Sequence, residues 1–82
     1  LSVIANTNGI SNTKVSKENY AKIQSGMTTT QVSEIMGKSD MVSESETPGL
    51  GKMELWHYQL GTTAIDVTFF NGMVYDKTWT EL

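Results

Sequence analysis

Two stretches of the sequence decide the fold: residues 20–37, YAKIQSGMTTTQVSEIMG, and residues 56–74, WHYQLGTTAIDVTFFNGMV. The first stretch contains signals that start and stop two short helices. The second alternates apolar and polar residues, which is typical of strands. Neither stretch contains a catalytic motif. Together they predict helices packed on a β-sheet.

The second helix of the first stretch has the clearer boundaries. Thr28 and Gln31 have the spacing of a capping box, in which each side chain bonds to the backbone of the other residue. Met27 and Val32 have the spacing of the hydrophobic staple around that box. Gly37 follows the last periodic residue, at the place where a left-handed residue often ends a helix. We therefore expect a helix between Thr28 and Gly37.

An earlier helix has similar but weaker signals. Ser16 is a favourable N-cap residue, and Val15 and Tyr20 are spaced to form a staple across it. Gly26 comes after the last periodic residue, Ile23, and is expected to end the helix. Each helix has only about eight residues, below the roughly 12 to 15 at which an isolated helix becomes marginally stable. Both helices must therefore pack on a sheet.

The Asn-Gly pair at positions 71–72 is the strongest turn signal in the chain, because a type I′ turn needs positive φ at both central residues. A two-residue loop there places Phe69 opposite Val74 and Asp66 opposite Lys77. The second pair is a plausible cross-strand ion pair. The sequence thus predicts an antiparallel hairpin centred on this turn.

Two more strands are expected before this hairpin. Residues 54–60 alternate, and a turn at 61–63 leads into Ile65, so that Trp56 and Tyr58 share the buried face with Ile65, Val67 and Phe69. A weaker strand covers residues 40–46, and residues 47–51 form the loop after it. The fold class is therefore α+β: two short N-terminal helices packed on one face of a three- or four-stranded antiparallel meander.

Several residues of this pattern recur together in a known superfamily. They are Tyr20-x-x-Ile23-x-x-Gly26-Met27-Thr28-x-x-x-Val32, Gly37, Trp56-x-Tyr58, Ile65-x-Val67-x-Phe69 and Asn71-Gly72-x-Val74. In these residues the chain resembles the β-lactamase-inhibitor-protein-like superfamily. That superfamily includes the BamE (SmpA/OmlA) family and small extracellular lipoprotein domains of Gram-positive bacteria. The resemblance implies a binding module that is secreted or anchored to the cell envelope. All of these residues support the fold, so the resemblance implies no partner-contacting residue.

Composition excludes some classes of binding partner. The chain has 82 residues, a net charge of −3, no cysteine and six scattered lysines. This charge argues against nucleic-acid binding and against a polybasic membrane patch. Residues 1–15 are polar and are expected to be a tail or linker, and residues 16–82 the domain. We expect any membrane attachment to come from an anchor upstream of Leu1.

Catalytic or metal-binding residues are scarce. His57 is the only histidine and is expected beside Asp66 or Thr68, yet no serine stands on a nucleophile elbow. Residues 49–52, GLGK, lack the other residues of a phosphate loop. Glu44 and Glu46 share one strand face, where carboxylates most often protect an edge rather than bind metal. We predict a non-enzymatic domain without a cofactor.

The face of the sheet away from the helices is predicted to be aromatic, which is unusual for an exposed face. The expected partner-binding residues there are Phe70, Tyr75, Lys77, Trp79 and His57. Two alternatives remain open. The N-terminal tail or a second copy covers these rings, or a bulge near residue 76 turns the indole at position 79 into the core.

Protein recognition through this aromatic face is the function that the sequence favours. Aromatic residues ringed by polar ones are typical of protein-binding hot spots. Two other functions remain open: a module that binds carbohydrate or peptidoglycan by stacking on sugar rings, and a structural envelope domain that binds nothing.

Overall fold

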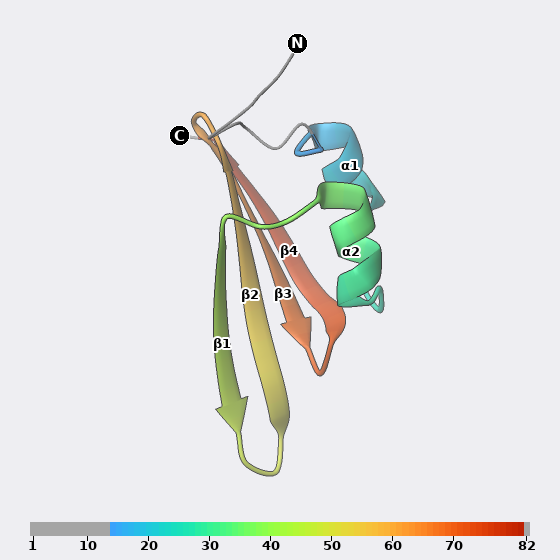
Figure 1. Ribbon diagram of the computed structural model, residues 1–82, viewed down its shortest axis with the longest axis vertical. Coiled ribbons are helices and arrows are strands. Elements are labelled where there is room, and N and C mark those ends of the chain that lie inside the picture. Colours follow the sequence, from blue (N-terminus) through green and yellow to red (C-terminus); the bar gives the residue numbers. More distant parts are fainter. Residues whose placement is uncertain (1–13, 82) are drawn as a thin grey trace.

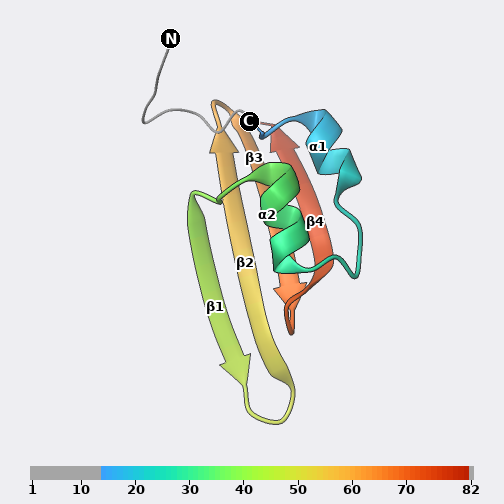
Figure 2. The ribbon, with the colours of Figure 1, turned by 45° about the vertical axis from the view of Figure 1, so that its right-hand side comes forward.

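The computed structural model describes residues 14–81, which form two helices and one four-stranded antiparallel sheet (Figure 1). The strands lie in the order β1-β2-β3-β4. Both helices lie on the same face of the sheet, so the predicted α+β class is confirmed (Figure 2). The elements are α1 (Lys17–Lys22), α2 (Thr29–Met36), β1 (Met41–Thr47), β2 (Gly51–Leu60), β3 (Thr63–Phe70) and β4 (Met73–Glu81).

Helix α2 begins with the predicted capping box. The Thr28 hydroxyl accepts a hydrogen bond from the Gln31 amide at 3.2 Å, and the Gln31 side-chain oxygen accepts one from the Thr28 amide at 2.9 Å. At the other end, the Gly37 amide donates to the Ser33 carbonyl at 2.8 Å. Gly37 has a φ of +77°, as expected, but its ψ of −166° lies outside the left-handed helical region.

Replacement of Thr28 by alanine should lower the free energy of unfolding by about 1 kcal/mol, because the first turn of α2 loses its side-chain acceptor. Urea denaturation of the purified domain measures this loss. Thr30→Ala is the matched control, since Thr30 is exposed in the same turn and makes no capping bond. Equal losses in both variants would show that the box does not stabilise the helix.

Helix α1 is shorter than predicted. It starts at the expected cap, where the Ser16 hydroxyl accepts from the Asn19 amide at 3.1 Å. It ends at Ile23, which is already extended, and not at Gly26. The physical reason is that Ile23 leaves the helix to bury its side chain, while the Gly26 amide pairs with the Val74 carbonyl of β4 at 3.0 Å. Pairing with β4 therefore replaces a last helical turn.

The hairpin between β3 and β4 has the predicted turn. Asn71 and Gly72 have φ values of +52° and +83°, as a type I′ turn requires, and Phe69 lies opposite Val74. Immediately after this pair the register shifts by one residue, because Tyr75 is an extra residue in β4. Beyond this bulge every residue of β4 changes face relative to a regular hairpin.

The bulge overturns two predictions. Asp66 lies opposite Thr78 and not opposite Lys77, so the expected ion pair is wrong. Lys77 and Trp79 lie on the helix side of the sheet and not on the aromatic outer face. The alternative of a bulge that turns Trp79 inward is therefore confirmed.

Contacts with α1 give the physical reason for the bulge. The Lys77 ammonium donates to the Tyr20 carbonyl at 2.9 Å and lies 4.3 Å from the centre of the Tyr20 ring. The Trp79 ring lies 5.4 Å from the same ring. A regular hairpin would instead turn Asp76 and Thr78 toward the helices, where polar side chains would be poorly satisfied.

The core lies between the helices and the sheet. The predicted inward residues of β2 and β3 are confirmed, with Trp56 opposite Val67 and Tyr58 opposite Ile65. The Tyr58 hydroxyl donates to the Gly37 carbonyl at 2.9 Å, and burial raises the pKa of Tyr58 to about 12. The buried hydrophobic residues are Val15, Ile23, Val32, Met36, Tyr58, Ile65, Val67, Phe69 and Val74.

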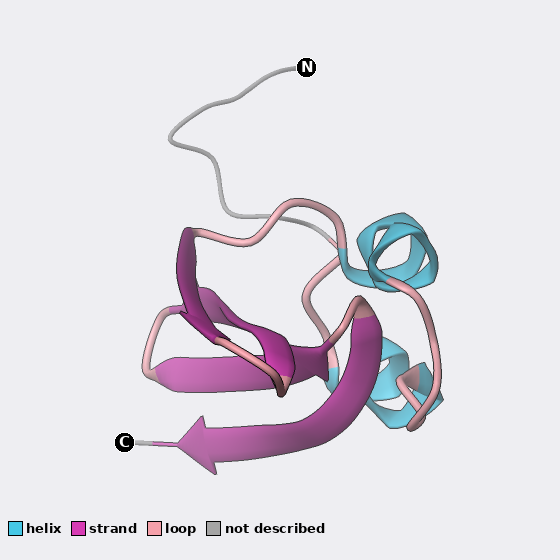
Figure 3. Ribbon diagram, turned by 90° about the horizontal axis from the view of Figure 1, so that it is seen from below, coloured by secondary structure: helices cyan, strands magenta, loops and turns pink. Residues whose placement is uncertain are grey.

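Residues 1–13 of the predicted tail lie outside the described residues, whereas Val15 is buried in the core. Seen along the strands, the sheet is curved and both helices occupy one side of it (Figure 3). The β1–β2 hairpin projects past the helices and past the β3–β4 turn (Figure 1). All seven residues of β1 are consequently exposed.

Candidate functional site

The outer face of the sheet, which is the face turned away from the helices, has a strip of exposed apolar side chains. We call it the apolar strip; it consists of Met53, Leu55, Phe70, Met73 and Tyr75. Their exposed fractions run from 37% for Phe70 to 68% for Tyr75. Cross-strand pairing aligns Met53 with Phe70 and Phe70 with Met73, so the strip crosses three strands.

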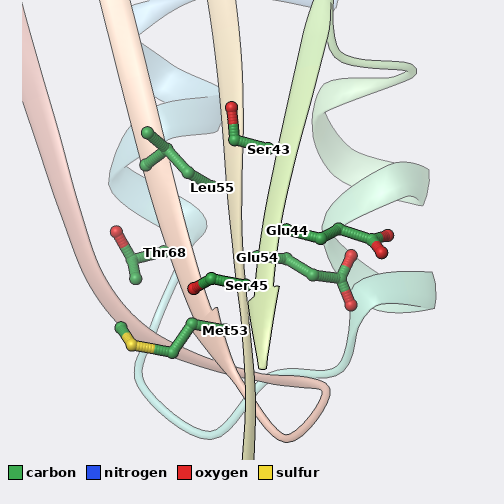
Figure 4. Close-up of a pocket in the computed structure, with 7 residues that line it drawn as sticks. All are labelled: Ser43, Glu44, Ser45, Met53, Glu54, Leu55 and Thr68. Carbon is green, nitrogen blue, oxygen red and sulfur yellow. The ribbon is translucent and has the colours of Figure 1, made fainter. Parts of the chain in front are cut away.

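Two shallow depressions lie along this strip. Met53, Phe70 and Tyr75 line one of them. The other lies over β1 and β2, where the side chains of Ser43, Ser45, Met53, Leu55 and Thr68 point to the outer face (Figure 4). The carboxylates of the same strands, Glu44 and Glu54, point the other way. The outer face therefore offers mainly apolar concavities, because Glu44 and Glu54, which also line the second one, turn their carboxylates to the other face.

A polar group of three side chains borders the apolar strip. His57 lies directly opposite Asp66, and its Nδ1 is 2.8 Å from the Asp66 carboxylate. Its Nε2 lies 3.0 Å from the side-chain oxygen of Gln59. The Gln59 amide nitrogen donates to the carbonyls of Gly61 and Thr63, which orients its oxygen toward the ring. Both ring nitrogens thus face hydrogen-bond acceptors.

Two acceptors favour the doubly protonated imidazolium, because a neutral ring has only one N–H to donate. The hydrogen bond to Asp66 is the main cause that raises the pKa of His57, and the bond to Gln59 adds to it. A raised folded-state pKa stabilises the fold below the unfolded value of about 6.5, and this stabilisation is lost as the pH rises through the folded pKa.

Asp66→Asn should therefore bring the pKa of His57 back toward its ordinary value. An NMR titration of the ring protons measures this shift directly. Stability of the wild type should also fall as the pH rises past the folded pKa, and the variant should lose most of this dependence. An unchanged titration in Asp66→Asn would show that the ion pair does not set the pKa.

Three of the five predicted contact residues, Phe70, Tyr75 and His57, lie on the outer face. Sequence reasoning missed Met53, because the strand was expected to start at Glu54, one residue too late. An earlier start would have placed Met53 in register with Leu55 and His57, on the outer face. The signal was therefore present in the alternation of β2.

On the outer face of the described residues, the His57–Asp66 pair comes closest to a catalytic arrangement. His57 and Asp66 resemble two members of a triad, but the other contact of the ring is the Gln59 amide, which is no nucleophile. Among residues 14–81 no group of three or more potential ligands is placed to hold a metal ion. In the same part of the chain, neither helix has the length and apolar character needed to cross a membrane.

The family model described as "Beta-lactamase inhibitor (BLIP)" matches residues 8–82, which is most of the chain. No curated protein and no solved structure matches the chain. The match covers both helices and all four strands described above. The chain therefore belongs to the β-lactamase inhibitor (BLIP) family.

Proposed function

We propose that this domain is a non-enzymatic binding module that recognises a protein through the outer face of its sheet. The observation that carries this proposal is the apolar strip, whose five side chains are exposed on a face that neither helix covers. Soluble domains usually keep such a face polar. An exposed apolar patch with a polar border is typical of a protein interaction site.

Membership of the family supports a protein partner. The family's name describes inhibitors of β-lactamases, which act by binding another protein. A β-lactamase is therefore the first partner to test. The proposal also places the domain outside the cell membrane, as the resemblance of the sequence implies.

The geometry favours a protein over a carbohydrate. Trp56 and Trp79, the residues best suited to stack on sugar rings, both lie on the helix side. On the outer face, the polar side chains of Asp66 and Gln59 are already bound to His57, and the exposed Asp76, opposite Thr68, is a single planar polar group beside Tyr75. A sugar site needs free planar polar groups around an aromatic platform. The wide apolar strip suits a protein surface better.

Tyr75→Ala and Phe70→Ala should weaken partner binding while leaving the fold intact. Each ring is partly exposed, so its loss should change stability by no more than about 1 kcal/mol. The loss of a hot-spot ring should cost about 2 kcal/mol of binding free energy, or roughly 30-fold in Kd. Calorimetric titration with a purified β-lactamase, or with a protein captured from extracellular extract, measures this.

Thr30→Ala is the matched control, since Thr30 is exposed on α2, on the helix side of the sheet. It should bind the partner like the wild type. Partner binding that survives both ring substitutions would overturn the proposed use of the outer face.

A further inference from the structure

Among residues 14–81, the outer edge of β1 pairs with no other strand. Strand β1 is the last strand of the sheet, and β2 is the only strand with which it pairs among the described residues. Seven consecutive pairs, from Met41 with His57 to Thr47 with Gly51, run without a register shift. A long, regular, exposed edge offers backbone groups to an added strand.

The opposite edge of the sheet is paired at the first residues of β4, so the edge of β1 is the more regular of the two. Val74 of β4 exchanges hydrogen bonds with the segment between the helices, through the Gly26 amide at 3.0 Å and the Met27 carbonyl at 2.8 Å. The bulge at Tyr75 then breaks the regularity of that edge. Strand β1 has no bulge, no lysine and no proline. The usual protections of an edge are therefore absent from β1, apart from its glutamates.

The outer side of β1 can accept apolar side chains. Ser43 and Ser45 are small, and they line the outer-face depression together with Met53 and Leu55 (Figure 4). In an added strand, alternate side chains would point to this side. Apolar side chains there would cover the exposed Met53 and Leu55.

The helix side of β1 is acidic. Glu44 lies directly opposite Glu54, and like charges in such a pair destabilise a sheet. Glu46 adds a third carboxylate on the same side, next to a single cation, Lys52. The Lys52 ammonium lies 3.4 Å from the Glu44 carboxylate, and both side chains are about half exposed. The other alternate side chains of an added strand would face this negative charge.

We propose that the β1 edge binds an extended peptide segment whose side chains alternate between apolar and cationic, as a fifth strand of the sheet. Backbone hydrogen bonds supply affinity, and the two sides of β1 select the pattern. A second copy of the chain does not fit, because full-length antiparallel pairing of two β1 strands sets Glu44 against Glu44 and Glu46 beside Val42. This site is separate from the contact proposed for the outer face, although Met53 and Leu55 border both.

The test uses capped peptides of one composition. The first is the alternating peptide, Ac-Lys-Val-Lys-Val-Lys-Val-Lys-NH2. The second removes the alternation by placing its four lysines before its three valines. The third keeps the alternating sequence but is methylated on its internal backbone nitrogens, so these cannot donate hydrogen bonds. Only the first should bind, with amide shifts and slowed hydrogen exchange along β1 in NMR spectra. Tyr75→Ala should leave this binding unchanged, which separates it from recognition by the outer face.

Charge is tested with a double variant, Glu44→Gln with Glu46→Gln, which should lower affinity for the alternating peptide at least tenfold at low salt. The matched control is Glu18→Gln with Glu34→Gln, which removes two exposed carboxylates from the helices and should change nothing. The proposal would be overturned if the peptide with its lysines before its valines, or the methylated peptide, bound as well as the alternating peptide. Slowed hydrogen exchange at amides outside β1 would overturn it too. A dimer held together by β1 in the free protein would overturn the choice of occupant.

Discussion

Phe69→Ala should unfold most of the domain, whereas Phe70→Ala should leave it folded. Phe69 is fully buried and its ring lies 4.5 Å from that of Trp56, while its neighbour Phe70 is 37% exposed on the outer face. Removal of a buried phenylalanine costs about 3 to 5 kcal/mol. This is most of the stability expected of so small a domain, which lies near the lower end of about 5 to 15 kcal/mol.

Urea denaturation followed by tryptophan fluorescence compares the two variants with the wild type. The pair is well matched, because the same ring is removed from adjacent positions of β3. Similar losses in both variants would contradict the alternation of faces along this strand. Val67→Ala, also fully buried, should follow Phe69→Ala with a loss of about 2 kcal/mol or more.

Trp79→Ala should destabilise the domain far more than Tyr75→Ala does. The Trp79 ring packs on Tyr20 and on the core, and its indole N–H donates to Glu81 at 3.0 Å. Because Trp79 is only partly buried, we expect a loss of about 2 to 3 kcal/mol. Tyr75 is 68% exposed, and its loss should remain within about 1 kcal/mol.

The bulge is the cause of this difference, and thermal melting of the two variants measures it. A double-mutant cycle with Tyr20→Ala adds a direct check on the ring contact, since residues in contact couple and distant residues do not. A Trp79→Ala variant that melts like the wild type would mean that the register shift in β4 is absent.

Local signals in the sequence predict much of this fold. The capping box of Thr28 and Gln31, the type I′ turn at residues 71–72 and the alternation of β2 and β3 depend on residues close in the chain. Each was confirmed because the cap and turn rules concern backbone groups that have few other partners. The same alternation also correctly placed His57 opposite Asp66 or Thr68, and the structure selects Asp66.

The missed Met53 was a local error in the start of β2, whereas the errors at α1 and β4 concern long-range competition. Ile23 and Gly26 have the pattern of a helix end, but pairing with β4 holds Gly26 elsewhere. The bulge at Tyr75 arises because Lys77 and Trp79 gain contacts with Tyr20, which lies more than fifty positions earlier in the chain. A rule based on neighbouring residues in the sequence cannot predict that contact. Two of the five predicted contact residues, Lys77 and Trp79, lie on the helix side for this reason.

Site-specific photo-crosslinking tests the central claim, which is protein recognition through the outer face. A benzophenone side chain replaces Tyr75 on the outer face in one protein and Thr30, exposed on α2 on the helix side, in another. Both are irradiated with the same partner, either a β-lactamase or a protein captured from extracellular extract. We predict that the partner is crosslinked from position 75 and not from position 30. Crosslinking from position 30 alone, or equally from both, would contradict the account.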